Sequence, residues 1–465
     1  MKDINAKKLL KGKFTENAKI ITASAALIYL LVSLYFMNHF FFDTVINGAD
    51  VSLKAHKVAE DIFINYVKGY KLKLTERYGE TEEITGRDIG MRYNRENRLY
   101  KIYKAQSSFK WPISLFKEQK YYVNDLFDYN KGSMEKRINE LNCLNQYIIE
   151  PRNVSFRYIK GYYETIGEIY GNKLHKDRLY EAIRMSVLRG QTKLDLNKSL
   201  CYIDPKYTLN SDKTPKTKKL LDKYVSAKIT YIFGNETVFL DKGTINQWLG
   251  VDEDLEVVID EKEVGNFIQE LSKKYDTVSQ ARAFKTAIGK RIEVKGGFYG
   301  WRINRPAETQ ALIENIKKGE MLEKEPVYSQ KAVTRGENDI GNTYVEINIT
   351  RQHLWFYKNG RLLAQGPIVS GNPNRGNATK LGVYMLNYKQ TETTIRGHNY
   401  EADITYWMPF NGNIGIHDAD WRYSFGGNIY KSNGTHGCIN VSRYLAKKIF
   451  ENIEEGTPVI CYEEE

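Results

Sequence analysis

A cysteine and a histidine near the C-terminus have the residue types and spacing of nucleophilic catalysis. Cys438 follows Gly434-Thr435-His436-Gly437, and His417 lies upstream at the end of an apolar run. A thiol attacks efficiently only as the thiolate, and a nearby imidazole is the usual base that generates it. A cysteine alone is more often a small buried hydrophobic residue. The two together, with a flexible glycine, predict a cysteine nucleophile with His417 as its base.

The elements expected around these residues would bring the base and the nucleophile together. Residues 413–418 are expected to form a short strand that carries His417, and residues 435–438 a tight turn. Residues 442–453 are expected to form a helix, because Ser442 is a good N-cap and apolar residues recur every four positions. Cys438 would then lie near a helix N-terminus, which favours an anion if it is close enough.

The motif resembles the signature of the L,D-transpeptidases. In that family a histidine and a spacer precede Ser/Thr-His-Gly-Cys, an apolar residue, and Asn or Arg. Here seventeen residues separate His417 from Thr435, within the range that the family allows, and Ile439 and Asn440 complete the motif after Cys438. The resemblance identifies the last 125 residues as a YkuD-type catalytic domain.

Upstream segments agree with this resemblance. Residues 344–360 resemble the family's opening hairpin, and their alternating apolar residues and Asn-Gly turn predict a hairpin on their own. Residues 369–371 and 379–384 resemble the next stretch, with Lys380 where the family often has proline. The fold implied for residues 341–465 is mainly β, a sandwich of the L,D-transpeptidase type with a helix after the catalytic cysteine.

The resemblance implies a cysteine acyltransferase of the bacterial wall that needs no cofactor. Cys438 would attack the carbonyl of the third residue, a diamino acid, in a donor tetrapeptide stem, and the terminal D-alanine would leave. A side-chain amine of an acceptor stem would then take the acyl group and form a 3→3 cross-link. Hydrolysis of the same acyl-enzyme would make an L,D-carboxypeptidase instead, and a wall-binding protein with a degenerate catalytic domain is a further alternative. The intact His417 and Cys438 argue against the last of these.

The resemblance also assigns roles next to the nucleophile. His417 would act as general base and later transfer a proton for the amine. The backbone carbonyl of Asp418 would orient the His417 ring. The backbone N–H groups of Gly437 and Cys438 would form the oxyanion hole.

Other residues of the motif region would support the site. His436 would shape the pocket or bind substrate, while Thr435 and Asn440 would be hydrogen-bonding scaffold. Trp421 and Tyr423 lie in a region that resembles the family's substrate-covering flap. We predict that they bind substrate, Trp421 as a wall of the stem-peptide groove, and core packing is the alternative for the aromatic residues of this region.

The N-terminus predicts a membrane anchor. Residues 20–42 contain no Asp, Glu, Lys or Arg, and as a helix these 23 residues would span about 34 Å, enough for a hydrocarbon core of about 30 Å. Six lysines and only two acidic residues lie in residues 1–19, so the positive-inside rule places this tail in the cytoplasm. We expect a single-pass protein of the cell membrane with an extracytoplasmic catalytic domain. A cleavable signal peptide and a buried core helix are the alternatives.

Composition limits the partners. The net charge of +12 could suit anionic wall polymers, in addition to the donor and acceptor stems. Nucleic acid is rejected, because the lysines are scattered and the anchor would export the chain. The seven histidines are dispersed, so no metal site is predicted.

The middle of the chain contains an internal repeat. Tyr170-Gly171 and Tyr299-Gly300 each precede a helical run that ends at a glycine, and further matches upstream keep nearly the same offset. We predict two copies of one α+β module, residues 50–205 and 210–335, the first with an insertion near residues 92–118. The copies resemble peptidoglycan-binding domains that precede this catalytic domain in Gram-positive relatives. A spacer through the wall is the alternative.

The remaining cysteines are not assigned to catalysis. Cys461 lies in an alternating terminal strand and is expected to be buried and inert. Cys143 and Cys201 both fall in the first module, and outside the cell they could form a disulfide.

Overall fold

The computed structural model describes residues 2–96, 98–336, 338–397 and 400–464. The chain divides into two compact units. The first comprises residues 1–155 and 166–211, and the second comprises residues 156–165 and 212–465.

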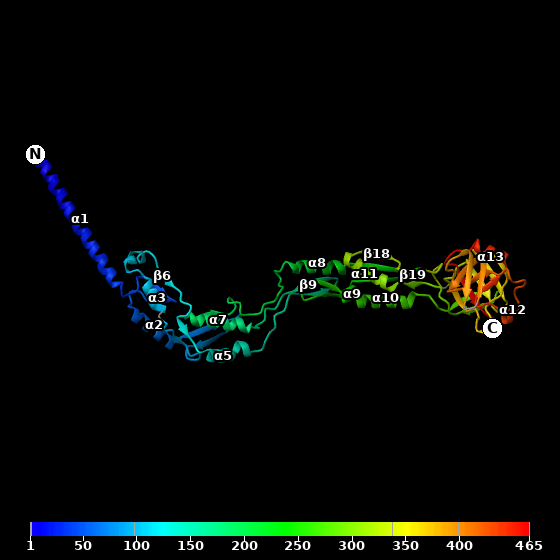
Figure 1. Cartoon of the computed structure of the whole chain (residues 1–465), viewed down its shortest axis with the longest axis horizontal. Coiled ribbons are helices and arrows are strands. Elements are labelled where there is room, and N and C mark those ends of the chain that lie inside the picture. Colours follow the sequence, from blue (N-terminus) through cyan, green and yellow to red (C-terminus); the bar gives the residue numbers. More distant parts are fainter. Residues whose placement is uncertain (1, 97, 337, 398–399, 465) are drawn as a thin grey trace. The chain divides into compact units, whose positions relative to one another are not determined.

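The first unit begins with one long helix, α1 (Lys2–Tyr35) (Figure 1). Its part Thr15–Tyr35 is long and apolar enough to cross a membrane. The helix ends at Tyr35, seven residues before the end of the predicted anchor of residues 20–42. Phe36, Phe40 and Phe41 follow it and are buried. They therefore belong to the packed part of this unit and do not extend the apolar helix.

The rest of the first unit, residues 44–155 and 166–211, is an α+β module that we call module 1. Its core includes Phe63, Leu72, Ile183 and Leu194. Its elements are β1 (Thr44–Ile46), β2 (Ala49–Asp50), α2 (His56–Lys68), β3 (Lys71–Thr75), β4 (Thr81–Thr85), β5 (Arg92–Tyr93), α3 (Arg98–Ala105), the 3-10 helix η1 (Ser108–Lys110), α4 (Trp111–Ser114), β6 (Gln119–Tyr121), β7 (Phe127–Asp128), α5 (Lys131–Asn139), α6 (Asn142–Asn145), α7 (Lys176–Leu188) and β10 (Lys193–Asp195).

Residues 156–165 and 212–335 form module 2 of the second unit. The hairpin of β8 and β9 packs on α8 through Tyr163, Leu221 and Val225, although the sequence repeat assigned it to the first module. The elements of module 2 are β8 (Ser155–Ile159), β9 (Tyr162–Ile166), α8 (Lys213–Val225), β11 (Lys228–Phe233), β12 (Glu236–Leu240), α9 (Lys242–Trp248), β13 (Leu249–Val251), β14 (Val257–Ile259), α10 (Glu261–Tyr275), β15 (Arg282–Lys285), β16 (Arg291–Val294), β17 (Arg302–Ile303), α11 (Arg305–Lys318), β18 (Met321–Lys324) and β19 (Tyr328–Gln330).

The two modules share one topology. In module 1, β3 pairs antiparallel with β4 and parallel with β10, and in module 2, β11 pairs antiparallel with β12 and parallel with β18. One helix, α2 or α8, precedes each hairpin, and another, α7 or α11, precedes each parallel strand. This common order gives the sequence repeat a structural basis.

The C-terminal domain, residues 342–464, consists of two sheets with the core between them. One sheet has the order β22-β21-β20-β28-β23, and the other has the order β24-β25-β26-β27. Figure 1 shows this strand-rich domain at the C-terminal end of the chain. Its elements are β20 (Tyr344–Asn348), β21 (His353–Lys358), β22 (Arg361–Pro367), the 3-10 helix η2 (Pro373–Arg375), β23 (Gly382–Met385), β24 (Gln390–Gly397), β25 (Tyr400–Asn411), β26 (Ile414–Asp418), α12 (Ile429–Asn433), β27 (Ile439–Val441), α13 (Arg443–Phe450) and β28 (Pro458–Tyr462).

Two parallel strands position the predicted catalytic residues. His417 lies near the end of β26, and Cys438 immediately precedes β27. The strands pair in parallel, with His417 opposite Asn440. The helix α13 begins after Ser442, whose side chain accepts a hydrogen bond from Leu445 N, and it ends at Phe450 where the sequence predicted residue 453. Because β27 separates Cys438 from this helix, its N-terminus does not adjoin the thiol.

Within the second unit, the hairpin of β15 and β16 packs on the C-terminal domain. Phe284 and Val294 share a core with Val383 and Tyr462. The fully buried Glu346 accepts hydrogen bonds from Ala287 N at 2.9 Å and from the Tyr462 hydroxyl at 2.7 Å. Module 2 and the C-terminal domain are therefore joined by an apolar core with a buried carboxylate at its edge.

All four cysteines are buried free thiols. Cys461 lies in β28, as the alternation of that strand predicted.

Candidate active site

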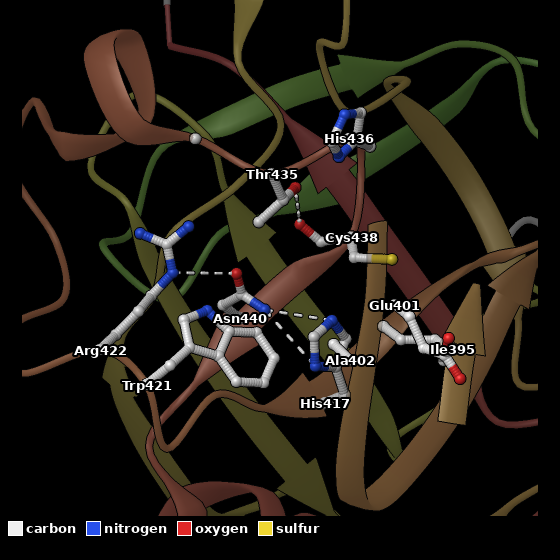
Figure 2. A pocket seen from close by; sticks show the side chains of 11 residues that line it. Ile395, Glu401, Ala402, His417, Trp421, Arg422, Thr435, His436, Cys438 and Asn440 are labelled. Carbon is white, nitrogen blue, oxygen red and sulfur yellow. Dashed lines mark hydrogen bonds between the residues drawn. The ribbon is translucent and has the colours of Figure 1, made fainter. Parts of the chain in front are cut away.

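A cavity of about 460 Å³ opens between β25, β26 and the turn that carries Cys438 (Figure 2). It brings together His417, Trp421, Thr435, His436, Cys438 and Asn440 of the predicted site. Its lining is Ile395, Glu401, Ala402, His417, Trp421, Arg422, Gly434, Thr435, His436, Cys438 and Asn440.

The buried His417 has a defined tautomer. Its Nδ1 lies 2.7 Å from the backbone oxygen of Asp418. Because a carbonyl oxygen can only accept, Nδ1 carries the proton and Nε2 carries the lone pair of a base. This is the contact that the sequence predicted for Asp418. Burial lowers the pKa of His417, so the ring is neutral at pH 7.

Asn440 lies over this ring. Its Nδ2 is 3.1 Å from Nε2 and 3.4 Å from Nδ1 of His417. A hydrogen bond in the ring plane to one nitrogen would leave the other much farther away. The near-equal distances therefore place the amide over the ring face, and the in-plane lone pair of Nε2 stays available.

Arg422 is a cavity residue that the sequence did not predict. It donates from Nε to Asn440 Oδ1 at 3.1 Å and from Nη1 to the Asn433 carbonyl at 2.8 Å. Among the residues that the structure describes, no carboxylate pairs with this guanidinium. Its positive charge contributes to the lowered pKa of His417, since it disfavours protonation of the ring.

The Cys438 thiol rests as the neutral form. It packs with Ile404 and Trp407, and its Sγ is directed toward the Asn413 carbonyl oxygen at 3.6 Å. Burial raises the pKa of the thiol to about 11, while a hydrogen bond from the Gly415 backbone acts in the opposite direction. Within the described ranges, no hydrogen bond joins Sγ to His417. The resting pair is thus a neutral thiol and a neutral imidazole, because both groups are desolvated.

Threonine hydroxyls fix the backbone around the thiol. Thr435 Oγ1 accepts from Gly437 N at 3.0 Å and donates to Cys438 O at 2.6 Å. The Gly437 N–H, predicted as an oxyanion donor, is therefore already bonded. The Cys438 N–H has no acceptor within the part of the chain that the structure describes, so it is the available donor of the two.

The peptide that carries the Cys438 N–H is held from its other side. Thr379 Oγ1 donates to Gly437 O at 2.8 Å and accepts from Gly371 N at 3.0 Å. In a trans peptide the C=O and N–H point in opposite directions. By holding the Gly437 carbonyl, Thr379 sets the direction of the Cys438 N–H.

Gly437 itself must be glycine. Its φ is +122°, a region that other residues rarely adopt, and a Cβ atom there would lie 2.9 Å from Ile414 Cδ1. The turn therefore brings its backbone against β26 at the point where the cavity opens.

The two predicted flap aromatics differ in position. Trp421 lines the cavity, and its ring centroid lies 6.0 Å from that of His417 (Figure 2). Tyr423 is fully exposed and is not part of the lining, so the structure does not bring it into the site. The preceding residue, Arg422, is held at the cavity by hydrogen bonds to Asn433 and Asn440.

The described residues contain no group of three or more His, Cys, Asp or Glu side chains that could hold a metal ion.

Comparisons with known proteins agree with this arrangement. The YkuD family, described as the L,D-transpeptidase catalytic domain, matches residues 342–461. The "Putative peptidoglycan binding domain" family matches residues 82–195 and 207–323. An L,D-transpeptidase of Enterococcus faecium, solved as a mutant, is 33% identical over 52% of this chain and 98% of its own, with a TM-score of 0.44. This chain belongs to the L,D-transpeptidase family.

Further solved relatives carry covalent adducts. The chain is 32% identical to the Ldtfm–avibactam carbamoyl enzyme, over 54% of this chain and 100% of that one, with a TM-score of 0.44. It is 38% identical to the catalytic domain of the E. faecium enzyme acylated by ertapenem, over 26% of this chain and 98% of that one, with a TM-score of 0.25. No curated protein matches the chain. The relatives support a transpeptidase-type function and confirm the family that the motif predicted.

Proposed function

We propose that this protein is a membrane-anchored L,D-transpeptidase that forms 3→3 cross-links between peptidoglycan stems through a thioester on Cys438. One observation carries the proposal. The Asp418 carbonyl fixes His417 with its proton on Nδ1, so that Nε2 is a free base in the cavity that Cys438 also lines. The alternative of a degenerate wall-binding protein is disfavoured, since such a protein has no need to keep this tautomer or the free Cys438 N–H.

The acylation step would begin from a neutral pair. A rotation of the Cys438 side chain away from the Asn413 carbonyl brings Sγ toward Nε2, and the proton passes to Nε2 as sulfur bonds to the substrate carbonyl carbon. The Cys438 N–H stabilises the developing oxyanion. The bond between the carbonyl carbon and the D-alanine nitrogen then breaks, and His417 returns the proton to the leaving amine. The product is a thioester, which an acceptor amine attacks by the reverse sequence.

Arg422 offers a site for the terminal carboxylate of the donor. It is a half-buried cation without a carboxylate partner among the described residues, and Figure 2 shows it on the cavity wall beside Asn440 and Trp421. A guanidinium binds carboxylates through charge-assisted hydrogen bonds. In a tetrapeptide stem the carboxylate of D-alanine lies one residue beyond the bond that breaks, so its capture would place that bond at the thiol. Trp421 would cover the stem, and His436 would shape the same groove.

Hydrolysis is the second candidate function, since water could release the same acyl-enzyme and make the protein an L,D-carboxypeptidase. Mass spectrometry of muropeptides incubated with the full chain separates the two reactions. Dimers joined 3→3 indicate transfer and tripeptide stems indicate trimming. Cys438→Ala is expected to abolish both, and dimer formation at an undiminished rate by this variant would refute the proposal.

The anchor and the modules complete the proposed arrangement. The apolar part of α1 would cross the membrane with residues 1–19 in the cytoplasm, and the modules, near the predicted ranges 50–205 and 210–335, would bind peptidoglycan or carry the catalytic domain through the wall. Anionic wall polymers are a further partner for the basic chain. Intact mass of the protein from membranes tests the anchor, because loss of the N-terminal residues would indicate a cleaved signal peptide instead.

A further inference from the structure

The stretch Thr15–Tyr35 of α1 is long enough to cross a membrane, but its fully uncharged part is shorter. Its uncharged run from Ile20 to Tyr35 is sixteen residues long, which corresponds to about 24 Å of helix against a hydrocarbon core of about 30 Å. Extension toward the N-terminus brings Lys19 and Glu16 into the span, and charged groups in the hydrocarbon are costly. Extension in the other direction is impossible as helix, since the chain leaves α1 at Tyr35 and buries Phe36.

The insertion of module 1 lies against the last turns of the same helix. The Tyr29 hydroxyl donates to the Phe109 carbonyl at 2.8 Å, and the Tyr29 ring lies 6.3 Å from that of Phe109 and 6.1 Å from that of Trp111. The ring of Phe36, the residue directly after α1, lies 6.4 Å from the Trp111 ring. Tyr29 is six residues before the end of α1, or about 9 Å along its axis. Segment 108–116 therefore runs at the depth of helix turns that would be in the membrane.

The outer surface of this segment is apolar. Phe109, Ile113, Leu115 and Phe116, which we call the insertion patch, are each at least half exposed, and Phe116 is 91% exposed. Leu34 and Met37, at the end of α1, are also exposed. A surface of this kind is unfavourable in water and is typical of a binding face.

Two exposed lysines accompany the insertion patch in the sequence. Lys110 directly follows Phe109, and Lys117 directly follows Phe116. Aromatic and aliphatic side chains bordered by lysines are typical of elements that lie in the membrane interface, where the apolar groups enter the acyl region and the cations meet phosphate groups.

We infer that segment 108–117 is embedded in the outer interface of the bilayer that α1 crosses, so that the insertion patch contacts lipid and module 1 sits on the membrane. The inference rests on the proposed anchor. Lipid is the expected contact of the insertion patch, because the patch continues the exposed apolar surface of α1. The segment is hydrogen-bonded to that helix through Tyr29.

The test uses the full chain, with Cys438 replaced by alanine, in liposomes of phosphatidylglycerol and phosphatidylcholine. A nitroxide label is placed by Phe116→Cys. Two matched labels are placed by Leu27→Cys in α1 and by Phe239→Cys, an exposed aromatic position of module 2. Relaxation by oxygen, which concentrates in lipid, is compared with relaxation by a water-soluble nickel chelate. All three side chains are exposed, so the labels should not disturb folding.

We expect the label at 116 to be relaxed several-fold more by oxygen than by nickel, as at 27, and the label at 239 to show the opposite preference. A water-like label at 116 beside a lipid-like label at 27 would overturn the inference and leave the anchor standing. A water-like label at 27 would refute the anchor and, with it, the inference. A label at 116 that neither reagent reaches would indicate a protein partner, such as a second copy, and would also overturn the lipid assignment.

Discussion

Thr379 is the residue whose replacement tests the oxyanion geometry most directly. It is buried and lies outside the cavity lining, and its hydroxyl bonds to the Gly437 carbonyl and the Gly371 N–H. Thr379→Val keeps the shape of the side chain and removes the hydroxyl. The Gly437 carbonyl and the Gly371 N–H then lose their partner, and the peptide that presents the Cys438 N–H is free to rotate.

The magnitude follows from what that N–H contributes. Loss of one oxyanion donor costs about 2.7–4 kcal/mol of transition-state stabilisation, or about 10²–10³ in rate. Thr435 still holds the peptides on both sides of the displaced one, so a partial loss is expected. We predict that acylation of Cys438 slows about 10- to 100-fold in Thr379→Val, since each tenfold corresponds to about 1.4 kcal/mol.

The assay is the rate of covalent mass gain on Cys438 with a carbapenem, a reagent class that acylates the E. faecium relative. Thr379→Ser is the matched control, because serine keeps both hydrogen bonds and loses one methyl group, worth about 1 kcal/mol of burial. Near-ultraviolet circular dichroism checks that both variants are folded. Acylation of folded Thr379→Val at the wild-type rate, or an equal loss in the serine variant, would refute the assignment.

Three further predictions concern other groups of the second unit. Arg422→Met should lower kcat/KM about 10- to 100-fold for a donor stem with a free terminal carboxylate, because a charge-assisted hydrogen bond is lost. The loss should be far smaller for the same stem ending in an amide. Equal losses for both stems would contradict carboxylate binding. Burial raises the pKa of Cys438 to about 11 and lowers that of His417. The carbapenem acylation rate should therefore be flat from about pH 7 to 9 and fall only below the ordinary histidine pKa of about 6.5. A rise in rate near pH 8.5, where an exposed thiol ionises, would contradict the neutral pair. Glu346→Ala should destabilise the packing of the β15–β16 hairpin by about 1–3 kcal/mol, since the partly buried Ala287 N–H loses its acceptor. Hydrogen exchange of that hairpin should accelerate. Isosteric Glu346→Gln keeps an acceptor, so its hairpin should exchange nearly as the wild type does.

The sequence predicted contacts that are local in the chain. The bond from His417 to the carbonyl of the next residue needs only a strand that ends there, and the parallel pairing of β26 with β27 then places Asn440 beside the ring. Thr379 and Arg422 belong to no part of the motif. Thr379 reaches Gly437 from 58 residues away, a contact that only the packed domain creates. A cation four residues after the strand was a signal for Arg422, but nothing in the sequence shows that it lacks a carboxylate partner.

The C-terminal end of the anchor helix could not be predicted from the sequence. An uncharged run has the same composition whether its last residues face lipid or fill a core. In the structure Phe36, Phe40 and Phe41 are buried. A role for the insertion near residues 92–118 can be inferred only from its contact with Tyr29. The four residues of the insertion patch have no periodic pattern that would indicate a membrane element.

In the proposed location outside the cytoplasm, the neutral resting pair would protect the proposed nucleophile. Outside the cytoplasm thiols are exposed to oxidation, and oxidation proceeds through the thiolate. A thiol with a pKa raised to about 11, packed with Ile404 and Trp407, holds little thiolate at neutral pH. Reactivity then depends on bound substrate, which brings a carbonyl for the thiol to attack while His417 accepts the proton. Burial of Cys438 and the fixed tautomer of His417 are therefore complementary, since the first suppresses reaction with oxidants and the second supplies a base at the moment of acyl transfer.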